Sequence, residues 1–449
     1  MRKKLTIILG LVIAMSMILT ACAQPAAAPT TAPAGGDTGA KPFAGKTINV
    51  MMEGVPDTEY VQALLPQFEE KTGAKVNIEV LNYALMHEKL VPQLTAAEKA
   101  GSYDLIVVDN YWVAEFNRAG WLLPLDDRIA ASTTIKTDVY LKSMMEMVGT
   151  YKDKVYMLPF YNYAMALTYR DDMFTDPKLQ EEYKAKYGKD LALPTSIPEY
   201  VELAKFMTRD TDGDGTVDVY GASMQGLRPD PTAMEFLNYL YSMGGLLYDN
   251  AGNVALKEDV GVAALDAYVD AMKNAAPPGA PSYGFDEAFA TVAQGKAFSY
   301  ITYNWMLPVM NDPEKSQVVN KMKLSVVPGG IGLLGGWGWA IPKSSPNPDL
   351  AWAFIEWVES FDVAKARALA GGAPTRADVF QDADVLAKYP HYSEVEKIVG
   401  NAIMFPMQSR APQIVEVLGR VISETVAGTK TSQQAIQELI TEANNLRDQ

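Results

Sequence analysis

Short apolar segments alternate with amphipathic ones in the first part of the chain. The segments 46–52, 75–81 and 104–109 have the length of strands, and the last, DLIVVD, is apolar enough to be buried on both faces of a sheet. Apolar residues at helical spacing fill the intervals 58–72 and 86–100. This order of strands and helices predicts a parallel sheet with right-handed crossovers, in which ligands bind beyond the carboxyl ends of the strands.

The middle of the chain continues the α/β pattern with more helix. Ser196 and Glu199 form a capping-box pattern ahead of an apolar helix face, and a longer helix is predicted over 259–274. A strand is predicted over 297–302, and another helix over 349–359. The C-terminal third is predicted to be helical. The expected fold class is therefore α/β.

The N-terminus departs from this pattern and has the features of a secretory signal. Basic residues precede the uncharged stretch 5–19, which is shorter than the ~20 residues that span a bilayer. Cys22, the only cysteine among 449 residues, follows in LTAC, which resembles the bacterial lipobox. The resemblance implies cleavage before Cys22 and acylation of its sulfur, and the alternative is a buried cysteine near an ordinary cleavage site. We expect a lipoprotein signal peptide over 1–21 and a lipid-anchored flexible linker over 22–45, because Pro, Ala, Thr and Gly form no core.

Charge and composition narrow the classes of function. The formal net charge of −15 repels phosphates, so we expect no nucleic-acid partner. With two histidines and no second cysteine, a zinc or thiol active site is not expected. The nearest match to a phosphate-binding loop, around Lys296, lacks the glycine and the Ser/Thr that this loop needs, so an ATPase would be a separate polypeptide.

Seven segments in the expected order resemble the sugar-binding lipoproteins of bacterial ABC importers, the maltose-binding-like solute-binding proteins of family 1. They are the lipobox, FEEKTGAKVNIEVL, DLIVVDNYWVAEFNRAGWLLPLDD, KVYMLPFYNYAMALTYRDDMF, GKAFSYITYNW, GGWGWAI and GGAPTR. The resemblance covers nearly all of residues 46–449. It implies a two-lobed periplasmic-binding-protein-like fold of type II, with two α/β lobes joined by a hinge of several strands and the ligand held in the cleft between them.

The resemblance also implies that the two lobes interleave along the sequence. The N-terminal lobe is expected to combine 46–162 with 338–365, and the C-terminal lobe to combine 163–337 with 366–449. The expected crossings between the lobes, in chain order, lie near 160–165, 336–339 and 364–370.

A neutral sugar needs partners for its hydroxyls and apolar surfaces for its C–H faces. Trp337 follows Gly335 and Gly336, which allow the backbone to approach a ligand and to rotate at a hinge. The resemblance implies a stacking aromatic at this place, and the alternative is that Trp337 lies in the core. Trp305 follows Asn304 at the end of a predicted strand and is a similar candidate from the other lobe, with the same alternative.

Further candidate contacts follow the predicted strands. Asp109, Asn110 and Tyr111 stand at the carboxyl end of the buried strand, where Asp109 suits paired hydroxyls but also suits the cap of the next helix. The resemblance implies that Asp57, like Glu53, touches sugar, and the alternative is that Asp57 supports the positive end of its helix. Without the family resemblance, Arg376 in GGAPTR is an ordinary surface charge, whereas the resemblance makes it the arginine that closes over the ligand. The remaining expected ligand contacts are Tyr161, Asn162 and Gln225.

The segment DTDGDGTVD has the spacing of a calcium loop. Its carboxylates at loop positions 1, 3, 5 and 9 are Asp210, Asp212, Asp214 and Asp218. The twelfth position is Gly221 instead of the usual Glu, so another ligand would have to complete the shell. The alternative is an Asp/Gly turn ahead of a strand. We therefore expect that the protein requires no cofactor and that a structural calcium ion is the one candidate.

These features predict a receptor that is monomeric and not an enzyme. We expect a lipid to anchor it at the extracytoplasmic face of a membrane, on the periplasmic side or at the cell surface. It binds a sugar or oligosaccharide between closing lobes and delivers it to an ABC import permease. One alternative is a secreted hydrolase or lyase, which needs two carboxyls ~5–9.5 Å apart. Another is the same receptor with a peptide, a polyamine or glycerol phosphate as ligand, and a polyamine would require an aromatic box with several carboxylates.

Overall fold

The computed structural model describes residues 41–96, 101–249, 251–405 and 407–448. The predicted signal peptide, Cys22 and nearly all of the predicted linker lie outside these residues, so they stay predictions. Lys41 to Gln449 form one compact unit.

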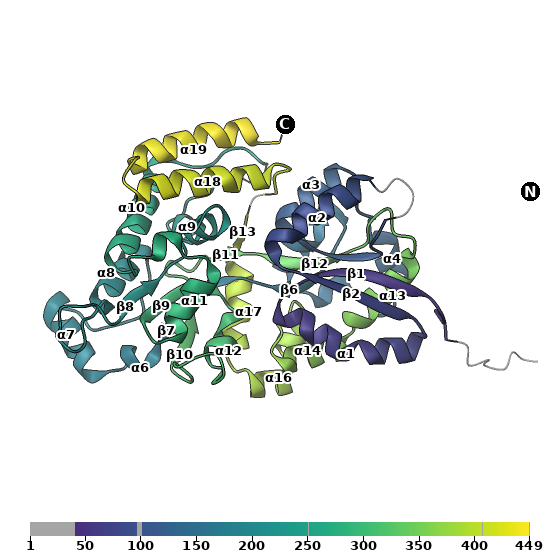
Figure 1. Ribbon diagram of the computed structural model, residues 1–449, viewed down its shortest axis with the longest axis horizontal. Coiled ribbons are helices and arrows are strands. Elements are labelled where there is room, and N and C mark those ends of the chain that lie inside the picture. Colours follow the sequence, from purple (N-terminus) through teal and green to yellow (C-terminus); the bar gives the residue numbers. More distant parts are fainter. Residues whose placement is uncertain (1–40, 97–100, 250, 406, 449) are drawn as a thin grey trace, which may run out of the picture. The chain divides into compact units, whose positions relative to one another are not determined.

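A five-stranded sheet organises the first group of elements (Figure 1). Its strands are β1 (Thr47–Glu53), β2 (Lys75–Leu81), β3 (Leu105–Asp109), β6 (Leu158–Asn162) and β12 (Gly336–Ala340). The strand order is β2-β1-β3-β12-β6. The parallel pairing of β1 with β2 and β3 is confirmed, whereas β12 runs antiparallel between β3 and β6. The three N-terminal strands are short apolar segments, which is why their positions could be predicted locally.

Helices lie on either side of this sheet, with α2 and α3 on one side and α1, α13 and α14 on the other in Figure 1. The helices of the first group are α1 (Pro56–Thr72), α2 (Tyr83–Ala96), α3 (Val113–Arg118), α4 (Asp126–Ala131), α5 (Lys142–Met144), α13 (Pro348–Val358), α14 (Phe361–Ala370), α15 (Ala377–Phe380), α16 (Ala383–Lys388) and α17 (Tyr392–Asn401). A short hairpin of β4 (Thr150–Tyr151) and β5 (Lys154–Val155) follows α5.

A four-stranded sheet organises the second group. In spatial order its strands are β10 (Met322–Ser325), β7 (Met165–Arg170), β9 (Ala297–Tyr303) and β8 (Tyr220–Ser223). The helices of this group are α6 (Asp171–Phe174), α7 (Pro177–Tyr187), α8 (Ile197–Met207), α9 (Asp230–Ser242), α10 (Glu258–Asn274), α11 (Phe285–Ala293), α12 (Met306–Met310), α18 (Ala411–Val426) and α19 (Ser432–Leu446). The Ser196 hydroxyl caps α8 by accepting the Glu199 N–H, as predicted, but the Glu199 carboxylate accepts from the Thr195 N–H and so does not complete the capping box. None of the helices in the described part of the chain combines the length and the apolar character that a bilayer crossing demands.

The chain passes between the two groups at three places. The first passage joins β6 to β7, and the second joins β11 (Leu333–Leu334) to β12. The third joins α17 to β13 (Ile403–Met404), which pairs in parallel with β11. The first two passages lie at or beside the predicted crossings. The third differs from the predicted 364–370, because helices α14 to α17 stay with the first group.

Hydrogen bonds show why residues 366–401 belong with the first sheet. The Thr375 hydroxyl donates to the Pro159 carbonyl at 3.1 Å, and the Asn162 amide donates to the Pro374 carbonyl at 2.5 Å. These bonds attach GGAPTR to β6. They do not support the predicted boundary at 366, and β12 joins the first sheet from Gly336 onward instead of 338. A helical pattern identifies a helix but not the sheet on which it packs.

The close packing of α8 on β8 generates a prediction about stability. A Cβ at Gly221 would lie 1.6 Å from the Ala204 carbonyl oxygen. Gly221→Ala should therefore push the helix from the sheet and lower the free energy of unfolding by about 2 kcal/mol or more. Thermal unfolding is the measurement.

The control is Gly400→Ala in α17, where nothing lies within 4 Å of an added Cβ. It should leave stability unchanged or raise it by up to about 1 kcal/mol, because alanine is the better helix former. Equal melting temperatures for Gly221→Ala and the wild type would contradict the close contact.

A candidate ligand site between the two groups

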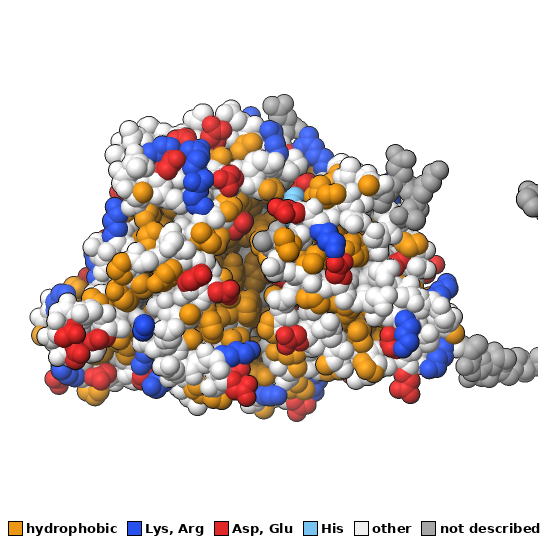
Figure 2. Space-filling view, viewed as in Figure 1, with side chains coloured by type: hydrophobic (Ala, Val, Ile, Leu, Met, Phe, Trp, Pro, Cys, Tyr) orange, Lys and Arg blue, Asp and Glu red, His pale blue; other side chains and the backbone are white. Residues whose placement is uncertain are grey.

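Figure 2 shows a hollow near the middle of one face of the molecule, with hydrophobic side chains on its visible floor and acidic side chains at its edges. Viewed as in Figure 1, it lies between the elements around the first sheet and those around the second. Side chains of the two groups also touch directly. The Tyr111 hydroxyl lies 2.9 Å from the Met234 sulfur in α9, and the Tyr163 ring meets the Tyr303 ring edge-on with centroids 5.4 Å apart. We call this contact region the junction.

Asp109 lies at the carboxyl end of β3, where a ligand contact is expected. Its side chain is buried and accepts hydrogen bonds from the Tyr163 hydroxyl at 2.7 Å and from the Tyr111 N–H at 3.2 Å. The second bond caps the short helical turn Asn110–Trp112. Asp109 therefore caps a helix, as the alternative interpretation stated. The cap hydrogen bond also fixes the position of its carboxyl beside the junction.

Three carboxyls around the junction have raised pKa values. Burial raises the pKa of Asp109 to about 8 and that of Glu53 to about 7, while hydrogen bonds from Tyr163 and Tyr161 respectively oppose these shifts. Burial also raises the pKa of Asp230, the first residue of α9, to about 6. The charges of Glu53 and Asp230 raise the pKa of Asp109 further. Carboxyls from the two groups are thus close enough to influence one another's ionisation.

Trp337 lies inside an aromatic cluster of the first group. It pairs with Asp109 on one side and Tyr161 on the other in the sheet, and it is 2% exposed. Its indole lies nearly parallel to the Tyr161 ring and edge-on to Tyr83 and Trp112. This is the placement that the core alternative describes.

Trp305 is more accessible. It is half-buried, and its ring is parallel to that of Tyr303, with an interplanar angle of 1° and centroids 6.4 Å apart. Phe285 packs against both rings. The second group therefore presents an aromatic wall that is partly open to a ligand.

The hydrogen-bond partners of Asn110 determine which of its amide atoms is free. Its Oδ1 accepts from the Gly336 N–H at 3.2 Å and lies 2.8 Å from the Tyr163 hydroxyl, whose single proton it shares with Asp109. Because a backbone N–H only donates, the oxygen must face Gly336. Its Nδ2 is left buried with no partner among the described residues. Asn110 thus offers a free donor.

The same reasoning applies to Asn304. Because a carbonyl only accepts, Asn162 must turn its Nδ2 toward Pro374, and its Oδ1 then accepts from the Asn304 Nδ2 at 3.0 Å. The Asn304 Oδ1 is left buried and unpaired within the described part of the chain, as is the Gln225 Nε2. Asn110, Asn304 and Gln225 are 1%, 3% and 2% exposed. Since buried polar atoms nearly always have partners, these three atoms need an explanation.

The structure holds Asp57 and Arg376 within the first group. Asp57 accepts from the Ala373 N–H at 3.2 Å, and burial raises its pKa to about 7. The Arg376 guanidinium donates to both carboxylate oxygens of Asp378 and, at 2.7 Å, to the Glu359 carbonyl. All three guanidinium nitrogens of Arg376 thus donate hydrogen bonds within the first group. For Arg376 to close over a ligand, as expected, these bonds would have to break.

Gly335 and Gly336 fit the start of β12 against its neighbours. A Cβ at Gly335 would lie 1.8 Å from the Tyr163 ring, and one at Gly336 would lie 2.6 Å from the Met144 side chain. The absence of Cβ atoms lets Tyr163 reach Asp109 and Asn110. The glycines therefore support the junction through packing.

Sequence reasoning missed four residues at the junction. Tyr163 lies in the first passage, between β6 and β7, and Tyr303 is the last residue of β9. Tyr83 is the first residue of α2, and Asp230 is the first residue of α9. Their only sequence signal was their position beside strand ends or in loops. Their mutual proximity depends on the pairing of distant segments, which a single sequence does not reveal.

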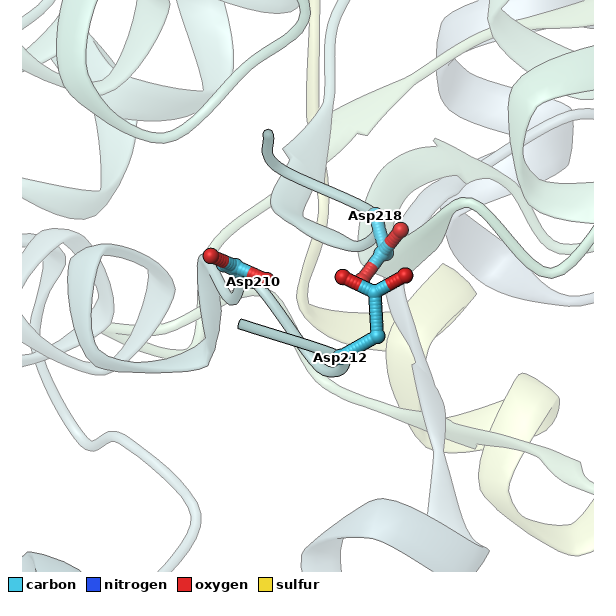
Figure 3. Close-up of side chains that lie close together, drawn as sticks. All are labelled: Asp210, Asp212 and Asp218. Carbon is cyan, nitrogen blue, oxygen red and sulfur yellow. The ribbon is translucent and has the colours of Figure 1, made fainter. Parts of the chain in front are cut away.

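The aspartate loop lies apart from the junction, ahead of β8. Carboxylate oxygens of Asp210, Asp212 and Asp218 lie within 4.8 Å of one another, and Figure 3 shows Asp212 and Asp218 turned toward each other. Asp214 is not part of this group and accepts from the Thr216 N–H at 2.7 Å. The Asp210 carboxylate accepts the N–H groups of two loop glycines. These bonds match the turn alternative, and calcium binding stays a prediction.

The raised pKa of Asp109 generates a prediction about pH. Its folded-state pKa of about 8 exceeds the usual 3.8, so the folded chain binds more protons than the unfolded chain between these values. The free energy of unfolding should therefore fall as pH rises through this range. Asp109→Asn, which cannot ionise, should melt at a higher temperature than the wild type at pH 8, with a smaller difference at pH 4. The same difference at both pH values would contradict the raised pKa.

Comparisons with known proteins agree on one family. The sequence model of the family described as bacterial extracellular solute-binding protein matches residues 54–365. A probable amino-acid ABC transporter periplasmic-binding protein of Sinorhizobium fredii is 24% identical over 401 residues, which are 89% of each chain. A mannitol-binding protein of Pseudomonas aeruginosa is 26% identical over 354 residues, which are 76% of each chain. The solved solute-binding protein of an ABC transporter from Agrobacterium radiobacter, in complex with ribitol, is 28% identical with a TM-score of 0.79, covering 90% of this chain and 100% of that one.

Proposed function

Because this chain belongs to the family of bacterial extracellular solute-binding proteins, we propose that it binds a sugar or polyol at the junction and delivers it, as a monomer, to an ABC import permease. Its fold is the mixed α/β fold of periplasmic binding proteins, with the two sheet groups as the two lobes. The family consists of binding proteins, so the chain is a receptor and not the hydrolase or lyase that the sequence left open.

Three buried side chains with unpaired amide atoms carry the proposal for the ligand: Asn110 of the first group, and Asn304 and Gln225 of the second. Asn110 offers a free donor and Asn304 a free acceptor, and Gln225 offers a side-chain amide that makes no hydrogen bond among the described residues. A hydroxyl group both donates and accepts, so a ligand with several hydroxyls suits both kinds of atom. An unpaired buried polar group costs about 1–3 kcal/mol, so a ligand that pairs these atoms is favoured over an analogue that lacks the hydroxyls.

Charge and shape support the same class of ligand. Glu53, Asp109 and Asp230 accept hydroxyl hydrogen bonds, and in their ionised forms they repel an anion such as glycerol phosphate. The parallel rings of Tyr303 and Trp305 suit the C–H surface of a carbohydrate chain or ring. One relative is named a mannitol-binding protein, and one solved relative is in complex with ribitol, and both ligands have this chemistry.

Titration calorimetry with ribitol, mannitol, glucose and maltose tests the proposal. The decisive variant is Gln225→Leu, because the Gln225 side chain makes no hydrogen bond among the described residues and its loss should leave the fold intact. It should weaken the affinity for the preferred ligand about 10-fold, since one buried donor loses its partner on the ligand. The control is Gln437→Leu in α19, an exposed position away from the junction, which should bind as the wild type does.

Three outcomes of this experiment decide the ligand class. Binding of a sugar or polyol that weakens only in Gln225→Leu supports the proposal. Heat from spermidine or a free amino acid, with none from any sugar or polyol, overturns it in favour of a cationic or amino-acid ligand. Equal affinities of the wild type and Gln225→Leu would remove Gln225 from the site.

We further propose that acylation of Cys22 anchors the receptor to the extracytoplasmic face of the membrane. The support is the LTAC sequence after an uncharged apolar stretch and before a Pro- and Ala-rich linker. The linker would leave the lobes free to meet both solute and permease.

Metabolic labelling with palmitate tests this anchor. The full-length chain expressed in a bacterium should incorporate the label and partition into detergent. Cys22→Ser should incorporate none, because it lacks the sulfur that carries the acyl chain. Equal labelling of the two chains would exclude Cys22 as the acylated residue.

A further inference from the structure

We propose that Glu235 is a positioning residue of the ligand site. Its buried carboxyl holds the β8–α9 loop, residues 224–229, in the conformation that presents Gln225 to the ligand. Glu235 does not itself touch the ligand. The inference rests on the proposed function for its binding readout and adds a residue that the sequence did not suggest.

The backbone of Gln225 is held from both sides by side chains of the second lobe. Its N–H donates to Glu235 Oε2 at 2.5 Å, and its carbonyl accepts from the Tyr268 hydroxyl at 3.0 Å. Glu235 is 1% exposed in α9, and Tyr268 is fully buried in α10. With both backbone groups engaged inside the lobe, the side-chain amide is the polar part of Gln225 that stays free.

The remainder of the loop is attached to the same scaffold. The N–H groups of Gly226 and Leu227 donate to the Tyr283 carbonyl at 3.1 and 2.9 Å. A Cβ at Gly226 would lie 2.4 Å from the Pro281 Cα, so the loop packs directly on that backbone. Binding groups need placement within about 0.5 Å, which requires a supporting set of contacts behind them. Glu235 supplies a side-chain hydrogen bond from α9 to this loop.

The surroundings of Glu235 explain why an acid is present here. Its carboxyl lies close to several tyrosines: burial chiefly raises the pKa values of Tyr200, Tyr239, Tyr268, Tyr300 and Tyr303, and the charge of Glu235, when ionised, adds to each shift. Burial raises the pKa of Glu235 well above its usual value, and the bond from Gln225 opposes this shift. A leucine of similar size would avoid the cost of burying a polar group. The acid is accounted for by the acceptor that it provides to the loop.

The test compares Glu235→Leu with Glu235→Gln by calorimetry, using the sugar or polyol that the wild type prefers. Glu235→Gln keeps an uncharged carbonyl acceptor and should bind within about 3-fold of the wild type. Glu235→Leu leaves the Gln225 N–H unpaired and should bind about 10-fold or more weakly. The control is Tyr239→Phe, one turn along α9, because the Tyr239 hydroxyl has no partner among the described residues. It should bind like the wild type.

Hydrogen exchange of a peptide spanning residues 224–230 gives a second readout that needs no ligand. Exchange should accelerate in Glu235→Leu and stay at the wild-type rate in Glu235→Gln and Tyr239→Phe. If Glu235→Leu does not fold, Tyr268→Phe removes the other hydrogen bond to Gln225, and it should accelerate exchange and weaken binding several-fold.

These readouts separate the inference from the proposed function. If the wild type binds no sugar or polyol, the proposed function fails, and the exchange data alone decide the role of Glu235. If the wild type binds and Glu235→Leu matches it in affinity and exchange, the positioning role is excluded. An equal loss in Glu235→Gln and Glu235→Leu would overturn the proposal, because the acceptor would then not be what matters.

Discussion

A buried polar atom needs a hydrogen-bond partner, and this requirement shapes the whole junction between the lobes. Tyr163 illustrates how the requirement is met. Its hydroxyl bonds to both Asp109 and Asn110 and so joins the first passage between the lobes to the end of β3. The Asn110 oxygen faces the Tyr163 hydroxyl and the Gly336 N–H, so the Asn110 side-chain nitrogen is left without a partner among the described residues. The free atoms at the site are thus consequences of the bonds that hold the fold.

The same constraint links stability to function. Unpaired amides and carboxyls with raised pKa values oppose folding, because each prefers the solvation of the unfolded chain. A ligand that pairs with them removes part of this cost and stabilises the folded state that it binds. Glu235 shows the opposite situation, since its buried carboxyl is matched with a backbone N–H and serves as support. The site therefore combines groups left without partners with groups whose partners are within the lobe.

The sequence predicted those features that depend on local patterns. The strands β1 to β3 and the polar residues that follow them were found because a strand end is visible as an apolar run followed by polar residues. Residues 366–401, which hold the end of α14 and helices α15 to α17, were expected in the second lobe, whereas GGAPTR is bonded to β6 through contacts that join distant segments. Trp337 and Arg376 have the residue types of ligand contacts, yet their neighbours bury one and engage the other. The orientation of an amide depends on its partners, so no sequence pattern could supply it.

A crystal structure of the chain with its preferred sugar or polyol would test the central claim most directly. The account predicts that ligand hydroxyl oxygens lie within about 3.2 Å of Asn110 Nδ2, Gln225 Nε2 and Asn304 Oδ1. It also predicts a face of the ligand against Trp305. A ligand bound elsewhere on the molecule, with these three amide atoms still unpaired or bonded only to one another, would contradict it.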